Sequence, residues 1–294
     1  MDVQVFRRAR AILGESLVWD PGTDATDSAL LWCDITAGQL HRSPLGGRSD
    51  GADDSSIDLP PPLASFHPAR GGGFVVSLGD RIVLTDAAGR LTRTLAALDH
   101  GPHLRLNEGK VDPRGRWVTG SMNIHDETPD GAYYSLDHTG RFETLYGGLG
   151  VANGLEWSLD GSRVYFTDTA VKTIYTAEYT SAGEMLNVAV FHSGSPNDGL
   201  AIDDDGCLWS GLYGEGLVVR YDPDGRELSS IELPVPQITS VAFGGADLGT
   251  LFVCSARENL TEEQLEAHPL SGSVFAIQTS TSGFAARSFG AVPR

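Results

Sequence analysis

The chain has 294 residues, a formal net charge of −18 at pH 7, 40% hydrophobic residues and 36 glycines. The excess of acidic residues argues against nucleic acid as a partner, because phosphate binding needs a clustered basic surface. No segment approaches the ~20 apolar residues that span a bilayer, and the N-terminus lacks the apolar core of a signal peptide, so we expect a cytoplasmic protein that does not bind membranes.

Taken in chain order, apolar segments that contain an aromatic residue recur at intervals of 42 to 48 residues. The aromatic residues are Trp32, Phe74, Trp117, Tyr165, Trp209 and Phe252. Each segment follows a short apolar run and a turn, and precedes a third run with strand-like character. In three copies a fourth run follows, at 90–95, 141–145 and 226–233. Four short strands per repeat of about 40 to 45 residues predict a β-propeller blade, and six copies fill the chain.

The N-terminal run with Val3, Val5 and Phe6 is a candidate for the outer strand of the last blade. A propeller has to close in some such way, because an open end leaves an unpaired strand edge. We therefore predict an all-β fold, a six-bladed β-propeller with four-stranded antiparallel blades, in a single domain over residues 1–294.

Two features with possible metal chemistry have simpler explanations. Cys33, Cys207 and Cys254 lie in three different repeats. Their odd number, without CxxC spacing, favours free buried thiols over disulfides or a zinc site. The acidic segments DDDG and DPDG lack the spacing of an EF-hand, so we interpret them as β-turns.

A polar side chain recurs five residues before the end of the first apolar run in four of the repeats. These residues are Glu15, Asn107, Asn153 and Asp198, whereas Pro62 and Thr239 stand at the same position in the other two. Asn or Asp before Gly also forms turns, but four oxygen-bearing side chains in register favour a site. Since the innermost strands of a propeller line its central channel, we expect the four side chains to surround one point.

Two carboxylates and two amides make an oxygen-rich set that suits one divalent metal ion. Ca²⁺, Mg²⁺ and Mn²⁺ prefer such hard ligands, and Zn²⁺ also accepts carboxylate oxygens, so the identity of the metal stays open. With few protein ligands, coordination positions would remain for water and substrate, as a catalytic metal requires.

Five segments resemble, in order and spacing, the motifs of the regucalcin (senescence marker protein)/gluconolactonase family. They are GESLVWDP, RLNEGKVDPRGRWVTGSM, NGLEWSLDGSRVYFTDT, PNDGLAIDDDGCLWSGLYG and FGGADLGTLFVCSAR. The segment LTEEQLEAHPLSGSVFAI looks most like the bacterial sugar-acid lactonases of that family. The resemblance implies a propeller with one divalent metal that hydrolyses a sugar-acid lactone (aldonolactone), a small molecule. We expect a monomer or a weak homo-oligomer.

The resemblance also implies roles for individual residues. Glu15, Asn153 and Asp198 match the metal ligands, and Arg105 and Asn107 match the substrate-binding pair. Asp198 is in addition the candidate general base, which would take a proton from the attacking water.

In the family, a further acidic substrate contact usually follows a GTM-like segment. Here GSMNIHDET places His125 at the direct count, with Asp126 and Glu127 just beyond, so His125 and Glu127 are the candidates. Two other functions fit the same fold: a calcium-binding or metabolite-binding propeller without turnover, and a related propeller esterase or phosphotriesterase.

Overall fold

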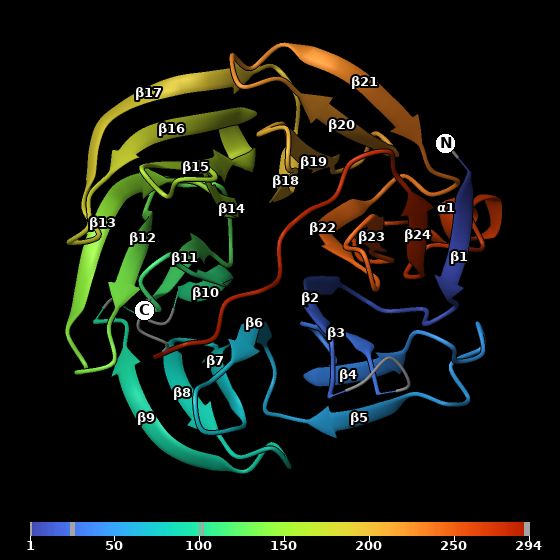
Figure 1. Ribbon diagram of the computed structural model, residues 1–294, viewed down its shortest axis with the longest axis horizontal. Coiled ribbons are helices and arrows are strands. Elements are labelled where there is room, and N and C mark those ends of the chain that lie inside the picture. Colours follow the sequence, from blue (N-terminus) through green and yellow to red (C-terminus); the bar gives the residue numbers. More distant parts are fainter. Residues whose placement is uncertain (1, 24–26, 100, 102, 291–294) are drawn as a thin grey trace. The chain divides into compact units, whose positions relative to one another are not determined.

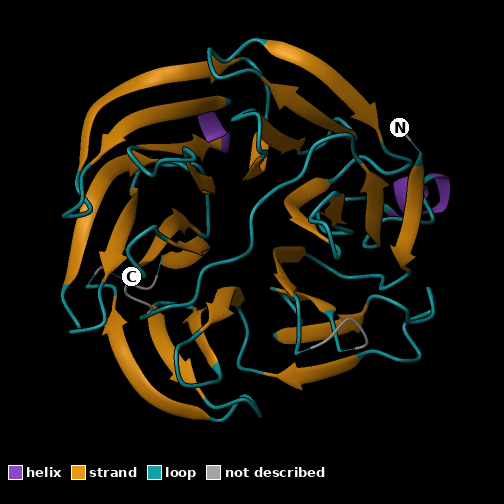
Figure 2. Cartoon of the chain, in the orientation of Figure 1, coloured by secondary structure: helices purple, strands orange, loops and turns teal. Residues whose placement is uncertain are grey.

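The computed structural model describes residues 2–23, 27–99, 101 and 103–290. Contacts group the chain into two compact units, Met1–Asp58 with Asp198–Ala285 and Leu59–Asn197 with Ala286–Arg294, and each is described by itself. Strands form almost all the regular structure of the described residues, accompanied by the short helices η1 (Thr169–Val171) and α1 (Glu262–Ala267) (Figure 1, Figure 2). No helix in these ranges is long and apolar enough to cross a membrane.

The first unit contains three four-stranded antiparallel sheets. One consists of β2 (Gly14–Asp20), β3 (Ala29–Asp34), β4 (Gln39–Pro44) and β5 (Ser55–Asp58), in this order. Another consists of β18 (Asn197–Ile202), whose first residue belongs to the second unit, β19 (Leu208–Leu212), β20 (Leu217–Tyr221) and β21 (Glu227–Glu232). The third runs from β22 (Ile238–Gly244) through β23 (Thr250–Ser255) and β24 (Val274–Gln278) to β1 (Val3–Arg7).

The second unit has three sheets of the same kind. Their strands are β6 (Leu63–Pro68), β7 (Phe74–Leu78), β8 (Arg81–Thr85) and β9 (Leu91–Ala97); β10 (Leu104–Val111), β11 (Trp117–Asn123), β12 (Gly131–Leu136) and β13 (Phe142–Leu149); and β14 (Ala152–Trp157), β15 (Arg163–Asp168), β16 (Thr173–Tyr179) and β17 (Met185–Ser193). In each sheet the strands follow one another in chain order, as Figure 1 shows.

These sheets confirm the predicted six-bladed β-propeller class. The six repeated aromatic residues all lie in the second strand of their sheet, namely β3, β7, β11, β15, β19 and β23. The N-terminal run forms β1, which pairs with β24 through Val3 and Ile277, so the last sheet takes its outer strand from the start of the chain. The single domain over residues 1–294 stays a prediction.

Neighbouring sheets within a unit pack through the aromatic side chains that the repeat supplies. In the first unit, Trp19 of β2 stacks on Phe252 of β23 with ring centroids 5.9 Å apart. In the second, Trp117 of β11 is fully buried and donates its indole N–H to Ser77 Oγ of β7 at 3.2 Å. Burying a large apolar side chain contributes about 1.5–3 kcal/mol, so each such contact helps to hold adjacent sheets together.

The two simpler explanations also hold in the structure. Cys33, Cys207 and Cys254 are buried and free, and burial raises the pKa of the Cys254 thiol well above its usual value. The DDDG segment is a β-turn, in which Gly206 N donates to Asp203 O at 2.9 Å.

Candidate active site

Three of the four polar residues that sequence analysis selected lie where the pairing of the innermost strands becomes irregular. The register with the second strand shifts between Glu15 and Val18 in β2, between Leu106 and Gly109 in β10, and between Asn153 and Leu155 in β14. A β-bulge bends a strand and changes the direction of its side chains, and bulges are common beside active sites. The irregular pairing therefore frees these side chains from the ordinary alternation of the sheet.

Glycines beside two of these residues let inner strands of neighbouring sheets approach closely. A Cβ atom on Gly109 would lie 2.3 Å from the Trp117 ring and 2.6 Å from Ser65 Oγ. A Cβ atom on Gly199 would lie 2.7 Å from Ser240 Cα. Since no side chain fits at these distances, glycine is required for the packing that positions Asn107 and Asp198.

In the second unit, three of the predicted site residues form one chain of hydrogen bonds. Arg105 Nη1 donates to Asn107 Oδ1 at 2.7 Å, and Asn107 Nδ2 donates to Asn153 Oδ1 at 2.7 Å. Asn153 Nδ2 then donates to Thr169 Oγ1 at 3.2 Å, and Thr169 Oγ1 donates to Asn197 O at 2.7 Å. These hydrogen bonds join β10 and β14 of adjacent sheets, so side chains from separate repeats meet here.

The backbone around Asn153 is held as firmly as its side chain. Tyr133, fully buried in β12, donates its hydroxyl to Asn153 O at 2.6 Å. Asn107 is 6% exposed and donates to Ala152 O at 3.1 Å as well. These bonds leave the Asn153 amide little freedom, so the position of its Oδ1 atom is set before any ligand binds.

In the first unit, Glu15 and Asp198 act electrostatically on a tyrosine that sequence analysis did not select. Tyr213 follows β19, and Asn259 Nδ2 donates to its hydroxyl at 2.9 Å. Burial raises the pKa of Tyr213 to about 12, and nearby carboxylates add to the rise. Those carboxylates belong to Asp198, Glu258 and Glu15. Asp198 is 4% exposed and Glu15 is half-buried. The two predicted carboxylate ligands of this unit therefore share one electrostatic environment.

Two further oxygen atoms of the first unit are buried acceptors without a hydrogen-bond partner, Gln237 Oε1 and Glu258 Oε2. The backbone of Gln237 pairs with that of Tyr213. A buried acceptor is costly to leave unpaired, so such atoms suit the hydroxyl groups of a bound molecule. No short sequence pattern marks Gln237, Tyr213 or Glu258, because each follows a different strand.

The loop between β11 and β12 holds the remaining candidates. His125 and Glu127 are exposed there, unlike Asn107 and Asp198. The loop begins at the buried Asn123, whose Oδ1 accepts from the His125 backbone N–H at 2.9 Å. The substrate roles of His125 and Glu127 stay predictions.

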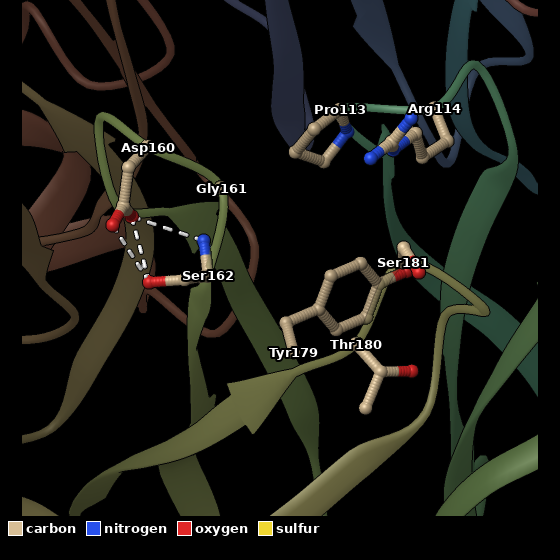
Figure 3. Close-up of a pocket in the computed structure, with 8 residues that line it drawn as sticks. All are labelled: Pro113, Arg114, Asp160, Gly161, Ser162, Tyr179, Thr180 and Ser181. Carbon is tan, nitrogen blue, oxygen red and sulfur yellow. Dashed lines mark hydrogen bonds between the residues drawn. The ribbon is translucent and has the colours of Figure 1, made fainter.

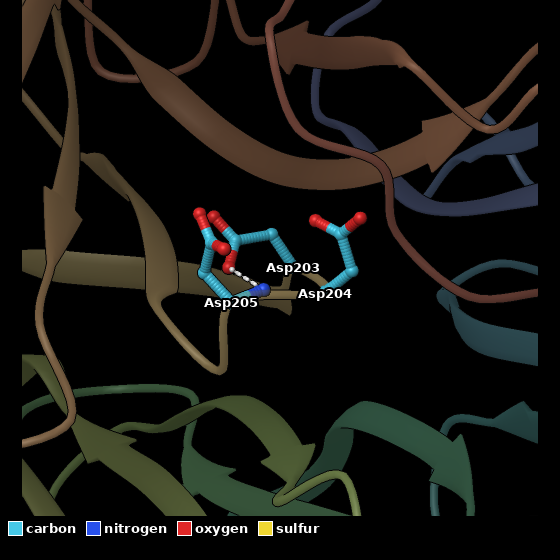
Figure 4. A group of neighbouring side chains, drawn as sticks. All are labelled: Asp203, Asp204 and Asp205. Atoms are coloured by element: carbon cyan, nitrogen blue, oxygen red, sulfur yellow. Dashed lines mark hydrogen bonds between the residues drawn. The ribbon is translucent and has the colours of Figure 1, made fainter.

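A separate acidic cluster consists of Asp203, Asp204 and Asp205 (Figure 4), whose carboxylate oxygens lie close enough together to be metal ligands. Protein donors already bond to these carboxylates. Asp203 Oδ2 accepts from Trp209 Nε1 and Arg220 Nε, both at 2.8 Å. Arg220 also bonds Asp205 Oδ2 at 2.7 Å, and Asp204 Oδ2 accepts from Ser282 Oγ at 2.9 Å. The cluster therefore stabilises the turn after β18 and is not a metal site.

A pocket of about 220 Å³ lies in the second unit at the opposite end of the strands from the predicted residues (Figure 3). It is lined by Pro113, Arg114, Asp160, Gly161, Ser162, Tyr179, Thr180 and Ser181. Pro113 and Arg114 follow the end of β10, whereas Arg105 and Asn107 lie near its start. Asp160 accepts hydrogen bonds from Ser158 and Ser162, which lower its pKa to about 2. The pocket is a gap between structural turns.

Comparisons with known proteins show the family of this chain. Residues 13–257 match the model of the SMP-30/Gluconolactonase/LRE-like region. The chain belongs to this family. It is 38% identical to 6-deoxy-6-sulfogluconolactonase of Pseudomonas putida over 284 residues, which cover 95% of each chain. It is 35% identical to L-arabinolactonase of Azospirillum brasilense over 295 residues, covering 97% of this chain and 94% of the relative.

Among solved structures, regucalcin from Agrobacterium tumefaciens, described as a calcium-binding protein, superimposes with a TM-score of 0.89 at 29% identity. The match covers 98% of this chain and 97% of that protein. This SMP-30/gluconolactonase family member therefore shares the fold of that regucalcin over nearly the whole of both chains. The family named from five short motifs is thus confirmed.

Proposed function

We propose that this family member is a metal-dependent lactonase, which hydrolyses a sugar-acid lactone to the open-chain acid. The observation that carries the proposal is the hydrogen-bond chain from Arg105 through Asn107 to Asn153, because it joins a predicted pair of substrate-binding residues to a predicted metal ligand. The relatives named 6-deoxy-6-sulfogluconolactonase and L-arabinolactonase support lactone hydrolysis as the reaction.

Glu15, Asn153 and Asp198 are the proposed ligands of one divalent ion. The donor set fits such an ion, since it offers two carboxylates and an amide whose Oδ1 atom is oriented as an acceptor by its neighbours. Ca²⁺, Zn²⁺, Mg²⁺ and Mn²⁺ all bind oxygen ligands of this kind. When bound, the ion would supply Lewis acidity toward the lactone carbonyl and lower the pKa of a water molecule.

The chain's own residues would perform the other tasks. Asp198 is buried, and its carboxylate would take the proton from the attacking water as the general base. Arg105 and Asn107 would bind the polar edge of the sugar, because a guanidinium and an amide offer directional donors and acceptors to hydroxyl groups. His125 and Glu127, on their exposed loop, would contact the part of the substrate that differs between pentono- and hexonolactones.

A second function deserves a direct comparison, because the solved regucalcin is described as a calcium-binding protein. In that case the same ligands would hold Ca²⁺ without turnover. A binding protein has no need of a base at Asp198 or of a pair that recognises sugar hydroxyls, so the lactonase explains more of the residues present.

The two functions are separated by measuring acid release from a panel of aldonolactones. The purified protein is treated with a chelator, and Ca²⁺, Zn²⁺, Mg²⁺ or Mn²⁺ is then restored one at a time. We expect acid release from at least one pentono- or hexonolactone that depends on the restored metal, and release roughly 10²-fold slower or more with the Asp198→Asn variant. Tight metal binding without hydrolysis of any lactone would instead establish the calcium-binding function.

A further inference from the structure

Thr169 has a hydroxyl group that bonds both the Asn153 side chain and the Asn197 carbonyl oxygen. It is the first residue of η1, directly after β15, and Asp168 caps this turn by accepting from Ala170 N at 3.2 Å. The backbone N–H of Thr169 donates to Val151 O at 3.1 Å. The turn is therefore fixed to the start of β14, and the Thr169 side chain has a defined place beside Asn153.

The hydrogen bonds of this hydroxyl can run in one direction only. The Asn197 carbonyl oxygen has no proton to give, so the 2.7 Å bond commits the single Thr169 proton to it. The Thr169 oxygen must then act as the acceptor in its 3.2 Å contact with Asn153. Asn153 consequently presents Nδ2 to Thr169, and its Oδ1 lies on the other side of the amide.

The hydrogen bonds of Arg105 and Asn107, at the other end of the series, enforce the same orientation of the Asn153 amide. Arg105 can only donate, so Asn107 meets it with Oδ1. Asn107 Nδ2 is also committed to the carbonyl of Ala152, which can only accept. A flipped Asn153 amide would place two acceptors together at Thr169 and two donors together at Asn107. Both ends therefore select the orientation in which Asn153 Oδ1 is the accepting atom.

We propose that Thr169 is a positioning residue that locks the Asn153 amide with Oδ1 presented as a metal ligand. The proposal rests on the metal site of the proposed function. The carbonyl that Thr169 holds belongs to the peptide group between Asn197 and Asp198, so one hydroxyl orients one proposed ligand and restrains the backbone that leads into another. Substrate contact is not required of Thr169, since it acts through Asn153.

Two substitutions distinguish the effect of the Thr169 hydroxyl from the effect of the side-chain shape. Thr169→Val keeps the branched shape and removes the hydroxyl, whereas Thr169→Ser keeps the hydroxyl. Thr173→Val is the matched control, because the Thr173 hydroxyl bonds Val171 O in the same turn at 3.0 Å and does not reach Asn153. The three variants and the wild type are compared by calorimetric titration with Mn²⁺ and Ca²⁺ and by thermal unfolding without metal.

Thr169→Val should bind metal about tenfold more weakly, the equivalent of one oriented hydrogen bond, and Thr169→Ser should bind within about twofold of the wild type. The kcat of Thr169→Val should recover at saturating metal while the KM for lactone stays unchanged. Thr173→Val should lose thermal stability and keep its metal affinity. Wild-type metal affinity in Thr169→Val, or no metal binding by the wild type, would overturn the proposal.

The test of Thr169 does not depend on lactone turnover, because the metal affinities are measured without substrate. A wild type that binds metal and hydrolyses no lactone would refute the lactonase function, and the comparison of Thr169→Val with Thr169→Ser would still decide the role of Thr169. Conversely, an active wild type with an unchanged Thr169→Val affinity would refute only the positioning role.

Discussion

His67 in β6 should make the protein less stable as the pH falls below neutrality. The imidazole is 5% exposed and lies against the Trp117 ring, with centroids 5.7 Å apart. Burial lowers its pKa from 6.5 to about 4, because the charged ring would lose its hydration, and the bond from Nδ1–H to Arg287 O at 3.1 Å opposes this less strongly. The folded protein therefore holds His67 neutral at pH values where the unfolded chain protonates it.

The size of the effect follows from the two pKa values. Between pH 6.5 and about 4 the unfolded chain binds more protons than the folded one, so stability falls as the pH falls through this window. At about 1.4 kcal/mol per pKa unit, the full loss is about 3 kcal/mol. The stabilisation is complete above pH 6.5 and is gone below about pH 4.

Glu108 in β10 has the opposite effect on the pH dependence of stability. Burial raises its pKa above 4.5, so its contribution to stability decreases as the pH rises from that value. The pH profile of the wild type alone would mix the two effects. A comparison with a His67 variant removes the Glu108 contribution, because that residue is present in both proteins.

The assay is urea unfolding of the wild type and of His67→Asn at several values from about pH 8 to about pH 4. Asparagine keeps an N–H donor for Arg287 O but does not titrate, so the variant should lose about 3 kcal/mol less than the wild type over this range. His125→Asn is the control, and it should keep the wild-type profile because that side chain is exposed in the folded protein. Parallel profiles for the wild type and His67→Asn would refute the burial of a neutral ring.

Four further predictions concern the proposed site. Asp198→Asn should lower kcat by roughly 10²–10⁴-fold and weaken metal binding, as kinetics and calorimetry would show, and near-normal turnover at saturating metal would remove Asp198 from the mechanism. Arg105→Ala should lower kcat/KM for sugar lactones with little change in metal affinity, whereas Asn107→Ala should affect both, because Asn107 also donates to Asn153. Replacing the loop His125–Glu127 should change the ratio of kcat/KM between pentono- and hexonolactones; an unchanged ratio would place the substrate elsewhere. Gly109→Ala should reduce the free energy of unfolding by about 1–3 kcal/mol or more in urea titrations, since its Cβ would lie 2.3 Å from the Trp117 ring.

The sequence by itself determined the blades and the positions of the candidate residues. Strand and turn signals are local, so the spacing of residues such as Trp32 and Trp117 was enough to predict which strand each occupies and that six repeats are present. The pairing of β1 with β24 followed from the need to protect a strand edge. The register of Glu15, Asn153 and Asp198 along the inner strands likewise needed only the repeat length.

Only the tertiary structure decided how these side chains are held. The amide of Asn153 is oriented by Asn107 and Thr169, which lie in other strands or turns and have no fixed spacing relative to it in the repeat. The electrostatic effect of Asp198, Glu258 and Glu15 on Tyr213 was not predictable for the same reason. Hydrogen bonds and electrostatic contacts of this kind depend on how neighbouring sheets pack, and a periodic pattern records which residues face inward but not which atoms they meet there.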